Sequence, residues 1–334
     1  TGKAGTGKTT LLKEIIATTH KNTVVVAPTG IAALNANGVT IHSMFQLPFA
    51  AFIPDNKQLP HFSDTVKFEN CDSLGRHFKM NNVKRSVIRN MELLVIDEVS
   101  MLRADVLDAM DFMMRKVRRN ERPFGGVQVL FIGDLLQLPP VVKNEEWEML
   151  KNYYRGMFFF HSHIIQQYPP LYIELDKIFR QTDAEFIDVL NNLRHNKITS
   201  EDVKILNQFV QPNFDLKKNK GFIILTTHNS KADTINAKSL EDLEGKQFTY
   251  LPEITADFPE KIYPLEEKLQ LKVGAQVMFI KNDLNFEKQF YNGKMGLISS
   301  LTEKEIFVHF SEENKTIEVE RYEWQNIRYK VNEN

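Results

Sequence analysis

The chain has 334 residues, 42% hydrophobic and 25% charged, with a formal net charge of −1 and one cysteine. This composition is typical of a folded protein of about two domains and excludes a disordered chain. No apolar run approaches membrane-spanning length, no signal peptide is visible, and the lone Cys71 excludes an internal disulfide and is interpreted as passive. Because the net charge is near zero, any nucleic-acid site must be a local groove.

The first predicted element is a phosphate-binding loop. Gly2–Thr9 match G-x-x-x-x-G-K-[ST], in which backbone N–H groups surround an anion, Lys8 reaches the terminal phosphates and the Thr9 hydroxyl ligates Mg²⁺. Apolar residues then recur at helical spacing, so a helix is predicted over 10–17, with its positive end toward the anion. Since a buried strand precedes this loop in such folds, we expect an internal piece of a longer protein. The predicted nucleotide contacts are Gly2, Ala4, Gly5, Thr6, Gly7, Lys8, Thr9 and Thr10.

A buried parallel strand is predicted next, because 23–27 is a short β-branched run that follows a helix. A short helix is expected at 31–34. Ligands bind at the carboxyl ends of parallel strands, which makes site candidates of Thr29, Gly30 and the nearby His42 and Ser43. For the histidine, a structural role is an equally good interpretation.

Residues 46–86 differ in character from the segments on either side. Prolines interrupt the pattern, and polar, charged and aromatic residues mix without a clear period. We interpret this stretch as an insertion into the domain and not as part of its sheet, with a simple surface excursion as the alternative.

The run 93–96 predicts a second buried strand, which delivers two carboxylates at its end. Asp97 is expected to hold Mg²⁺, directly or through water, and Glu98 to polarise the attacking water. An amphipathic helix is predicted over 105–119, and its basic end is better explained as a solvated helix end than as a DNA contact.

A third buried strand is predicted over 127–132, leading to Gln137. A neutral amide there can hydrogen-bond a γ-phosphate or its attacking water. Because these strands alternate with helices, the sequence predicts an α/β fold with a doubly wound parallel sheet.

Five motifs in this order resemble those of the petite-integration-frequency (PIF) DNA helicase family, which is related to the RecD-type motors of superfamily 1B. They are Gly2–Thr9, Ala27–Ala33, Asp97–Met101, Pro123–Gln128 and Gly133–Pro140. The resemblance covers the whole chain, most firmly residues 1–141. It implies RecA-like P-loop NTPase lobes with an inserted small β-barrel that is Src-homology-three-like, and ATP and Mg²⁺ as cofactors.

The resemblance also implies roles in the second lobe and along DNA. It makes Arg180 an arginine finger, where a surface ion pair would otherwise be favoured. A strand is predicted over 222–227. The resemblance implies that the residues at its end contact DNA phosphates, and a turn cap is the alternative. Phe45 and Phe49 are possible stacking platforms, although core packing is favoured for each. The DNA-binding set is Pro28, Thr29, Gly30, His42, Thr227, His228 and Asn229.

From about 246 the pattern changes to short strands with turns, at 269–280, 296–299, 306–310 and 316–320, which predicts a small β-barrel. The family's later segments, like His-Lys-Ser-Gln-Gly and Ala-Leu-Ser-Arg, do not occur here. The expected domains are therefore a first lobe without its opening strand (1–45 and 87–170), an inserted wedge-like subdomain (46–86), the first part of a second lobe whose closing half is absent (171–245), and the barrel (246–334).

The function predicted from the motifs and the resemblance is an ATP-dependent DNA helicase that translocates 5′ to 3′ on single-stranded DNA, of the telomere, replication and repair type. Expected partners are single-stranded and forked or partial-duplex DNA, with no membrane. The protein is expected to be monomeric and intracellular, cytoplasmic at the nucleoid in a bacterium. One alternative is a fragment that binds nucleotide or DNA without coupled turnover. A P-loop small-molecule kinase is disfavoured, because the chain lacks an arginine-rich lid after the second carboxylate.

Overall fold

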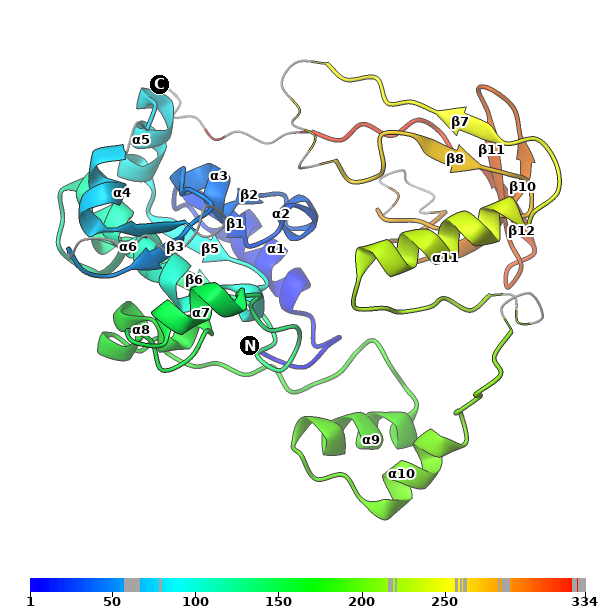
Figure 1. Cartoon of the computed structure of the whole chain (residues 1–334), viewed down its shortest axis with the longest axis horizontal. Helices are drawn as coiled ribbons and strands as arrows, with labels where there is room; N and C mark the ends of the chain where they lie inside the picture. The colour runs from blue at the N-terminus through cyan, green and yellow to red at the C-terminus, as the bar shows by residue number, and fades with distance from the viewer. Residues whose placement is uncertain are drawn as a thin grey trace. The chain divides into compact units, whose positions relative to one another are not determined.

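The chain forms two compact units (Figure 1). Unit 1 is made of Thr1–Val203 and includes Tyr329, and unit 2 spans Lys204–Asn326. The computed structural model describes residues 1–56, 67–77, 80–215, 219, 221–255, 258, 260, 263–281, 283, 289–325 and 329. Parts of the predicted insertion (57–66, 78–79) and of the predicted barrel therefore lie outside the described residues.

A parallel sheet of four strands is the centre of unit 1, in the order β2-β1-β5-β6. The register sets Val25 beside Val95, and Val95 beside Leu130. Because all four strands run in one direction, the carboxyl ends of β1, β5 and β6 meet at one edge. The strands are β1 (Thr23–Ala27), β2 (Val39–Thr40), β5 (Leu93–Ile96) and β6 (Gln128–Phe131).

Helices cover both faces of this sheet. Alternate residues of a strand point to opposite faces, and Val24 and Leu94 accordingly pack in the core formed with α5 and α6, whereas Val25 and Val95 pack against α1. The predicted α/β class with a doubly wound parallel sheet is confirmed. The helices of unit 1 outside the insertion are α1 (Lys8–Thr18), α2 (Gly30–Asn35), α3 (Ile41–Phe45), α5 (Asn82–Asn90), α6 (Ala104–Arg118), α7 (Asn144–Leu150), α8 (His163–Gln167) and α9 (Ala184–Arg194), with 3₁₀ turns at Val99–Met101, Pro123–Gly126 and Phe159–His161.

The helix α6 joins several segments through its buried aspartates. Asp105 accepts the Phe52 N–H, Asp108 accepts two N–H groups at the start of α8, and Asp111 accepts the Phe124 N–H. The basic end of α6 was predicted to be solvated, and for Arg118 this prediction is wrong. Arg118 donates from Nη1 to three backbone carbonyls at the end of α5 and just beyond it, at 2.6, 2.7 and 2.9 Å.

The described part of the predicted insertion lies outside the main sheet. It contains a two-stranded parallel sheet, β3 (Ala51–Ile53) with β4 (Phe68–Asn70), and the helix α4 (Cys71–His77). All three residues of β3 are buried, and Phe52 packs in the main core beside α6. This segment is therefore attached through the core and is more than a surface excursion.

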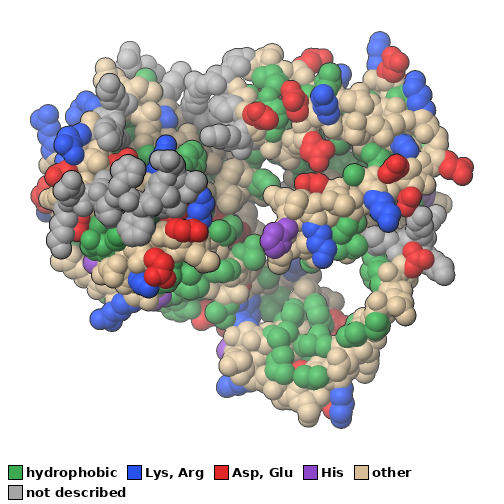
Figure 2. All heavy atoms as spheres, viewed as in Figure 1, with side chains coloured by type: hydrophobic (Ala, Val, Ile, Leu, Met, Phe, Trp, Pro, Cys, Tyr) green, Lys and Arg blue, Asp and Glu red, His purple; other side chains and the backbone are tan. Residues whose placement is uncertain are grey.

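The helix α9 is followed by α10 (Ser200–Asn207), and the two are joined by the Asn192 amide, which donates to the Asp202 carboxylate. Apolar side chains of this hairpin are exposed, and Figure 2 shows them as green patches on its surface. Those that belong to unit 1 are Phe186, Leu190, Leu193, Ile198 and Val203.

Unit 2 contains the helix α11 (Asn229–Glu241) and two antiparallel sheets. One sheet has the order β12-β11-β10-β9 and the other pairs β7 with β8. The predicted short strands are present, and a closed barrel stays a prediction. The strands are β7 (Phe248–Tyr250), β8 (Leu269–Leu271), β9 (Gln276–Met278), β10 (Met295–Leu301), β11 (Ile306–Phe310) and β12 (Lys315–Glu318).

The predicted strand over 222–227 is wrong. These residues belong to no strand, and the side chains of Phe222 and Leu225 are 58% and 87% exposed. A strand needs a neighbour to take its N–H and C=O groups, and within the described residues of unit 2 no strand pairs with this stretch. The start of the stretch is held instead by the side chain of Gln276, which donates to the Phe222 carbonyl at 2.8 Å and accepts the N–H of the preceding Gly221 at 3.0 Å.

Candidate active site

The phosphate loop has the backbone that its glycines allow. Gly5 and Gly7 have φ of +78° and +84°, a region that side-chain-bearing residues rarely adopt. Gly7 precedes α1, whose N-terminus has no side-chain cap, so the first-turn N–H groups are available to an anion. Thr6 is buried and donates from its hydroxyl to the Lys3 carbonyl at 2.9 Å, which closes the loop. Thr9 and Thr10, in the first turn of α1, are exposed, as is Ala4 in the loop.

Lys8 is held over this loop. Its ammonium donates to the carbonyls of Gly2 and Lys3, both at 2.9 Å. Burial lowers the pKa of Lys8, and the charges of Asp134 and Glu98 act in the opposite direction. The ammonium therefore lies within electrostatic reach of both acids, while its hydrogen bonds to the described residues go only to neutral carbonyls.

The two predicted carboxylates follow β5 at the same edge of the sheet. Asp97 is 9% exposed and accepts the Glu98 N–H at 2.9 Å. Glu98 has φ of +50°, in the left-handed region, at the point where β5 has ended and the 3₁₀ turn Val99–Met101 begins. Burial raises the pKa of both carboxyls; the charge of Asp97 raises that of Glu98 further, and Lys8 lowers both. Lys8, Asp97 and Glu98 thus form one interacting group.

The loop after β6 brings Gln137 to this edge. Gly133 permits a close approach to the 3₁₀ turn Val99–Met101 that follows β5, since a Cβ there would lie 2.9 Å from the Val99 nitrogen. Asp134 is 2% exposed and organises the turn: its Oδ2 accepts the Gln137 amide Nε2 at 3.2 Å, and its Oδ1 accepts the Leu136 N–H at 3.2 Å. Gln137 itself is exposed.

Arg180 lies next to the phosphate loop. The Phe179 N–H donates to the Gly5 carbonyl at 2.9 Å, and a Cβ on Gly5 would lie 2.5 Å from the Arg180 Cβ. The side chain of Arg180 is exposed, and its charge contributes to lowering the pKa of Lys8. The structure therefore brings the four predicted catalytic residues close to the phosphate loop: Lys8, Glu98, Gln137 and Arg180.

Two residues of α9 at this site were not predicted. Asn191 accepts the Lys3 ammonium at 2.7 Å, and Arg194 forms an ion pair with Asp134 at 2.7 Å. The sequence signals only a basic residue at a helix end, which is usually explained by the helix dipole. Nothing in the local pattern indicates a partner 60 residues away.

The arrangement suits a nucleotide with a divalent cation. The loop and the amino end of α1 offer N–H donors, and the Thr9 hydroxyl with the Asp97 carboxylate supplies the hard oxygen ligands that Mg²⁺ prefers. Among the described residues no group of three or more His, Cys, Asp or Glu gathers as a metal site of the all-protein kind. None of the described helices combines the length and apolar character needed to cross a membrane.

The predicted DNA-side residues of unit 1 follow β1 and β2. Thr29 caps α2, its hydroxyl accepting the Ala32 N–H at 3.2 Å, with Pro28 and Gly30 beside it half-buried. His42, on α3, stacks on Phe49 with ring centroids 4.8 Å apart and 13° between planes. Burial and then the charge of Arg103 lower the pKa of His42.

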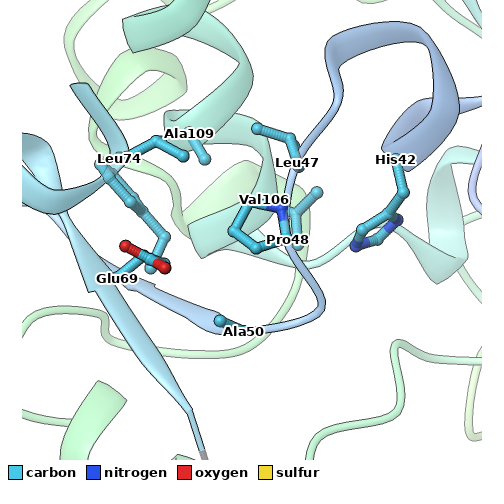
Figure 3. Close-up of a pocket in the computed structure, with 9 residues that line it drawn as sticks. His42, Leu47, Pro48, Ala50, Glu69, Leu74, Val106 and Ala109 are labelled. Carbon is cyan, nitrogen blue, oxygen red and sulfur yellow. The ribbon is translucent and has the colours of Figure 1, made fainter. Parts of the chain in front are cut away.

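Core packing is correct for Phe45, which is 0% exposed, and wrong for Phe49, which is 74% exposed. His42 also borders a small hollow away from the phosphate loop, and Figure 3 shows His42 at one side of it and Glu69 at the other. The other lining residues are Leu47, Pro48, Ala50, Phe52, Leu74, Val106 and Ala109.

The remaining predicted DNA contacts are in unit 2. Thr227, His228 and Asn229 are exposed at the start of α11, and the Thr227 hydroxyl lies 2.9 Å from His228 Nδ1. His228 provides no side-chain cap to the helix, so the turn-cap alternative does not apply to it.

Comparison with known proteins gives a consistent result. The model of the family described as PIF1-like helicase matches residues 1–204. The chain is 33% identical over 307 residues to the ATP-dependent DNA helicase PIF1 of Homo sapiens, which covers 89% of this chain and 43% of that protein. It is 32% identical to the Candida albicans protein of the same name, with 95% and 34% covered. The chain therefore spans less than half of the length of these relatives.

Solved structures of Bacteroides Pif1 are similar to the chain. One, a complex with ADP-AlF4, matches all of this chain and 72% of its own at 40% identity, with a TM-score of 0.85. Another, bound to single-stranded DNA, matches 99% and 72% at 40% identity, with a TM-score of 0.62.

Proposed function

Because the chain belongs to the PIF1-like helicase family, we propose that it carries the ATP-hydrolysing core of a DNA helicase that translocates 5′ to 3′ on single-stranded DNA and unwinds duplexes. The observation that carries the proposal is the meeting of Lys8, Asp97 and Glu98 at one sheet edge, where their charges affect one another's pKa values. The relatives' names and the Bacteroides complexes support the choice of ATP and DNA.

Phosphate binding begins with an exchange of partners by Lys8. The two carbonyls that hold its ammonium are neutral and belong to the loop itself. Terminal phosphates are better acceptors for an ammonium, because a charge-assisted bond is stronger than one to a neutral carbonyl. Backbone N–H groups from Gly5 to Thr10 then surround the phosphates, with the positive end of α1 behind them.

Thr9 and Asp97 would hold Mg²⁺, which when bound neutralises phosphate charge and orients the phosphoryl group. Asp97 suits this role because its raised pKa reflects a buried carboxylate with few partners. The Thr9 hydroxyl is exposed in the first turn of α1 and is free to turn toward a ligand.

Glu98 acts as the base for the attacking water. Burial and the charge of Asp97 raise the pKa of Glu98, which makes it a better proton acceptor than an ordinary glutamate. Gln137 orients the same water by hydrogen bonding, and Arg180 provides the positive charge that stabilises the transferring phosphoryl group. Each of these three side chains is at least partly exposed and can move toward the phosphates.

DNA contacts in this proposal come from both units, through Pro28, Thr29, Gly30 and His42 in unit 1 and Thr227, His228 and Asn229 in unit 2. The exposed Phe49, stacked on His42, offers a flat surface for a base. The same proposal includes forked and partial-duplex DNA as substrates and a monomeric state. It also includes an intracellular location, at the nucleoid in a bacterium, and roles in repair and telomere maintenance. So does the division into a first lobe, an insertion at 46–86, part of a second lobe and a barrel.

Steady-state ATP hydrolysis with and without single-stranded DNA tests this function. We expect DNA to stimulate hydrolysis by the wild-type chain and Lys8→Ala to abolish the activity while leaving the protein folded. Hydrolysis that DNA leaves unchanged, or that survives Lys8→Ala, would contradict the proposal.

A second candidate function is nucleotide or DNA binding without coupled turnover. The observation that favours it is the exposed apolar stretch 222–225, which pairs with no described strand of unit 2. Tight nucleotide binding together with a hydrolysis rate that is negligible in the presence of DNA would support this candidate over the first.

A further inference from the structure

Asp134 is the point at which α9 meets the Gln137 loop. Both of its carboxylate oxygens are engaged: Oδ1 accepts Arg194 Nη1 at 2.7 Å and the Leu136 N–H at 3.2 Å, and Oδ2 accepts Gln137 Nε2 at 3.2 Å. The side chains of Arg194 and Asp134 are 17% and 3% exposed. A single buried carboxylate therefore joins an arginine of α9 to the glutamine proposed to orient the attacking water.

The bond from Gln137 to Asp134 determines which end of the amide is available. An ionised carboxylate accepts hydrogen bonds and donates none, so it must receive the NH₂ end of the amide. The carbonyl Oε1 of Gln137 is then left to accept a hydrogen from another group. That is the polarity needed to orient a water molecule for attack on a phosphate.

Arg194 keeps Asp134 available for this task. A nearly buried carboxylate without a partner is unfavourable, and Asp134 lies close enough to Glu98 to raise the pKa of that residue. Pairing with Arg194 compensates the buried charge and fixes the carboxylate plane, because the arginine holds Oδ1 while Oδ2 faces Gln137.

The position of Arg194 is itself fixed with respect to the phosphate loop. Asn191, one helical turn earlier on α9, accepts the Lys3 ammonium at 2.7 Å. Because α9 is fastened both to the loop and to the turn after β6, a movement of the loop on nucleotide binding would be transmitted to Asp134 and from there to Gln137.

We propose that Arg194 is a positioning residue for ATP hydrolysis, which acts through Asp134 to hold the Gln137 amide in the orientation that binds the attacking water. The inference rests on the proposed function, since it assigns a role within the same reaction. Arg194 touches neither nucleotide nor water in this scheme, and its effect should depend wholly on Gln137.

The test is a double-mutant cycle on kcat for DNA-stimulated ATP hydrolysis, with Arg194→Ala, Gln137→Ala and the double variant. Loss of a single preorganised group typically reduces kcat by about 10² to 10³-fold, which we expect for Gln137→Ala, and about 10-fold for Arg194→Ala. Because coupled residues are not additive, the double variant should have the same kcat as Gln137→Ala. The KM for ATP should stay within about 3-fold of the wild-type value in all variants. Arg194→Lys, which keeps the charge, should recover part of the loss.

Arg103 supplies the matched control. It pairs with Asp105 at 2.8 Å with side-chain exposures of 17% and 2%, nearly those of the Arg194 pair, and also with Glu146 at 2.7 Å. Asp105 accepts the Phe52 N–H and has no hydrogen bond to Gln137. Any effect of Arg103→Ala on kcat should multiply with that of Gln137→Ala. If the effects of Arg194→Ala and Gln137→Ala also multiply, Arg194 has only a structural role and the proposal is wrong. If thermal unfolding shows that Arg194→Ala is not folded, the cycle is run with Arg194→Lys by the same criterion.

A measurement without turnover separates this proposal from the proposed function. Affinities for ADP alone and for ADP with aluminium fluoride, a mimic of the transferring phosphoryl group, are compared in the same variants. Arg194→Ala should bind ADP alone with the wild-type affinity. The factor by which aluminium fluoride increases the affinity for ADP should be about 10-fold smaller in Arg194→Ala than in the wild type. In the Gln137→Ala background, Arg194→Ala should leave this factor unchanged. Unchanged tightening in Arg194→Ala would overturn the positioning role, whether or not DNA stimulates the wild-type chain.

Discussion

Unit 1 contains two groups of buried charges that differ in how fully they are paired. Along α6, Asp105 accepts two hydrogen bonds from Arg103 and one from a backbone N–H, and Asp108 and Asp111 are similarly engaged. At the carboxyl edge of the sheet, and within the described part of the chain, Asp97 accepts only its neighbour's N–H and Lys8 donates only to loop carbonyls.

The difference separates the structural charges of α6 from the charges that are to receive the nucleotide. A buried charge whose hydrogen-bonding capacity is used holds the fold together, since removing one partner leaves the other uncompensated. A partly buried charge with unused capacity is retained at a cost in stability, which is reasonable where a ligand supplies the missing partners. The α6 group is of the first kind, and Lys8, Asp97 and Glu98 are of the second.

The largest expected effect is the loss of catalysis when a charge at the sheet edge is removed. Glu98→Gln should reduce kcat for DNA-stimulated hydrolysis by about 10³-fold, because the base is lost, while its thermal stability stays at or above that of the wild type. Steady-state kinetics and a thermal melt measure the two quantities. A stability loss as large as the catalytic loss would mean that Glu98 is structural.

For a charge on α6 we expect the opposite result, a loss of stability with little change in hydrolysis. Asp105→Ala leaves the Phe52 N–H without its acceptor and removes two of the three hydrogen bonds of the Arg103 guanidinium, which keeps only Glu146, and should cost about 3 kcal/mol of unfolding free energy. Hydrolysis per folded molecule should change little. Urea denaturation checks the first statement, and an unchanged denaturation midpoint would show that the α6 group is not what stabilises this region.

Two phenylalanines extend the comparison to apolar side chains. Phe49→Ala should weaken single-stranded DNA binding by about 1–3 kcal/mol, the usual worth of a stacked base, with little change in stability because the ring is 74% exposed. Phe45→Ala, at 0% exposed, should instead destabilise the fold. Fluorescence anisotropy with a labelled oligonucleotide measures the affinity, and equal binding by Phe49→Ala would exclude the stacking role.

The smallest expected effect is a shift in pH dependence. Burial and the charge of Asp97 raise the pKa of Glu98, so the base becomes protonated, and kcat/KM falls, at a higher pH than for an ordinary glutamate. The activity lost as the pH falls through this pKa should return fully on raising it. The residual rate of Glu98→Gln should lack this acidic limb; a limb of the same midpoint in that variant would assign it to another group.

The sequence predicts those parts of the site that depend on local pattern. Continuous apolar runs identify β1, β5 and β6, and the polar residues that follow them, from Thr29 to Asp97 and Gln137, are brought to one edge because parallel strands end together. The glycines of the phosphate loop likewise adopt the positive φ that their spacing suggests.

What the sequence misses depends on distant partners. Arg194 resembles any basic residue at a helix end until the fold brings Asp134 to it. The stretch 222–227 has the composition of a buried strand, yet it forms none because no described strand of unit 2 pairs with it. Phe49 lies in an insertion without period, so its exposure could not be read from spacing.

The most direct test of the account is a calorimetric titration of ADP with Mg²⁺ into the wild-type chain, Lys8→Ala and the α6 variant Arg103→Lys. We predict that Lys8→Ala lowers the affinity by at least about 10-fold, the loss of roughly one charge-assisted contact, and that Arg103→Lys binds as the wild type does. Equal affinity for Lys8→Ala and the wild type would show that the charges at the strand edge do not receive the nucleotide, and would contradict the account.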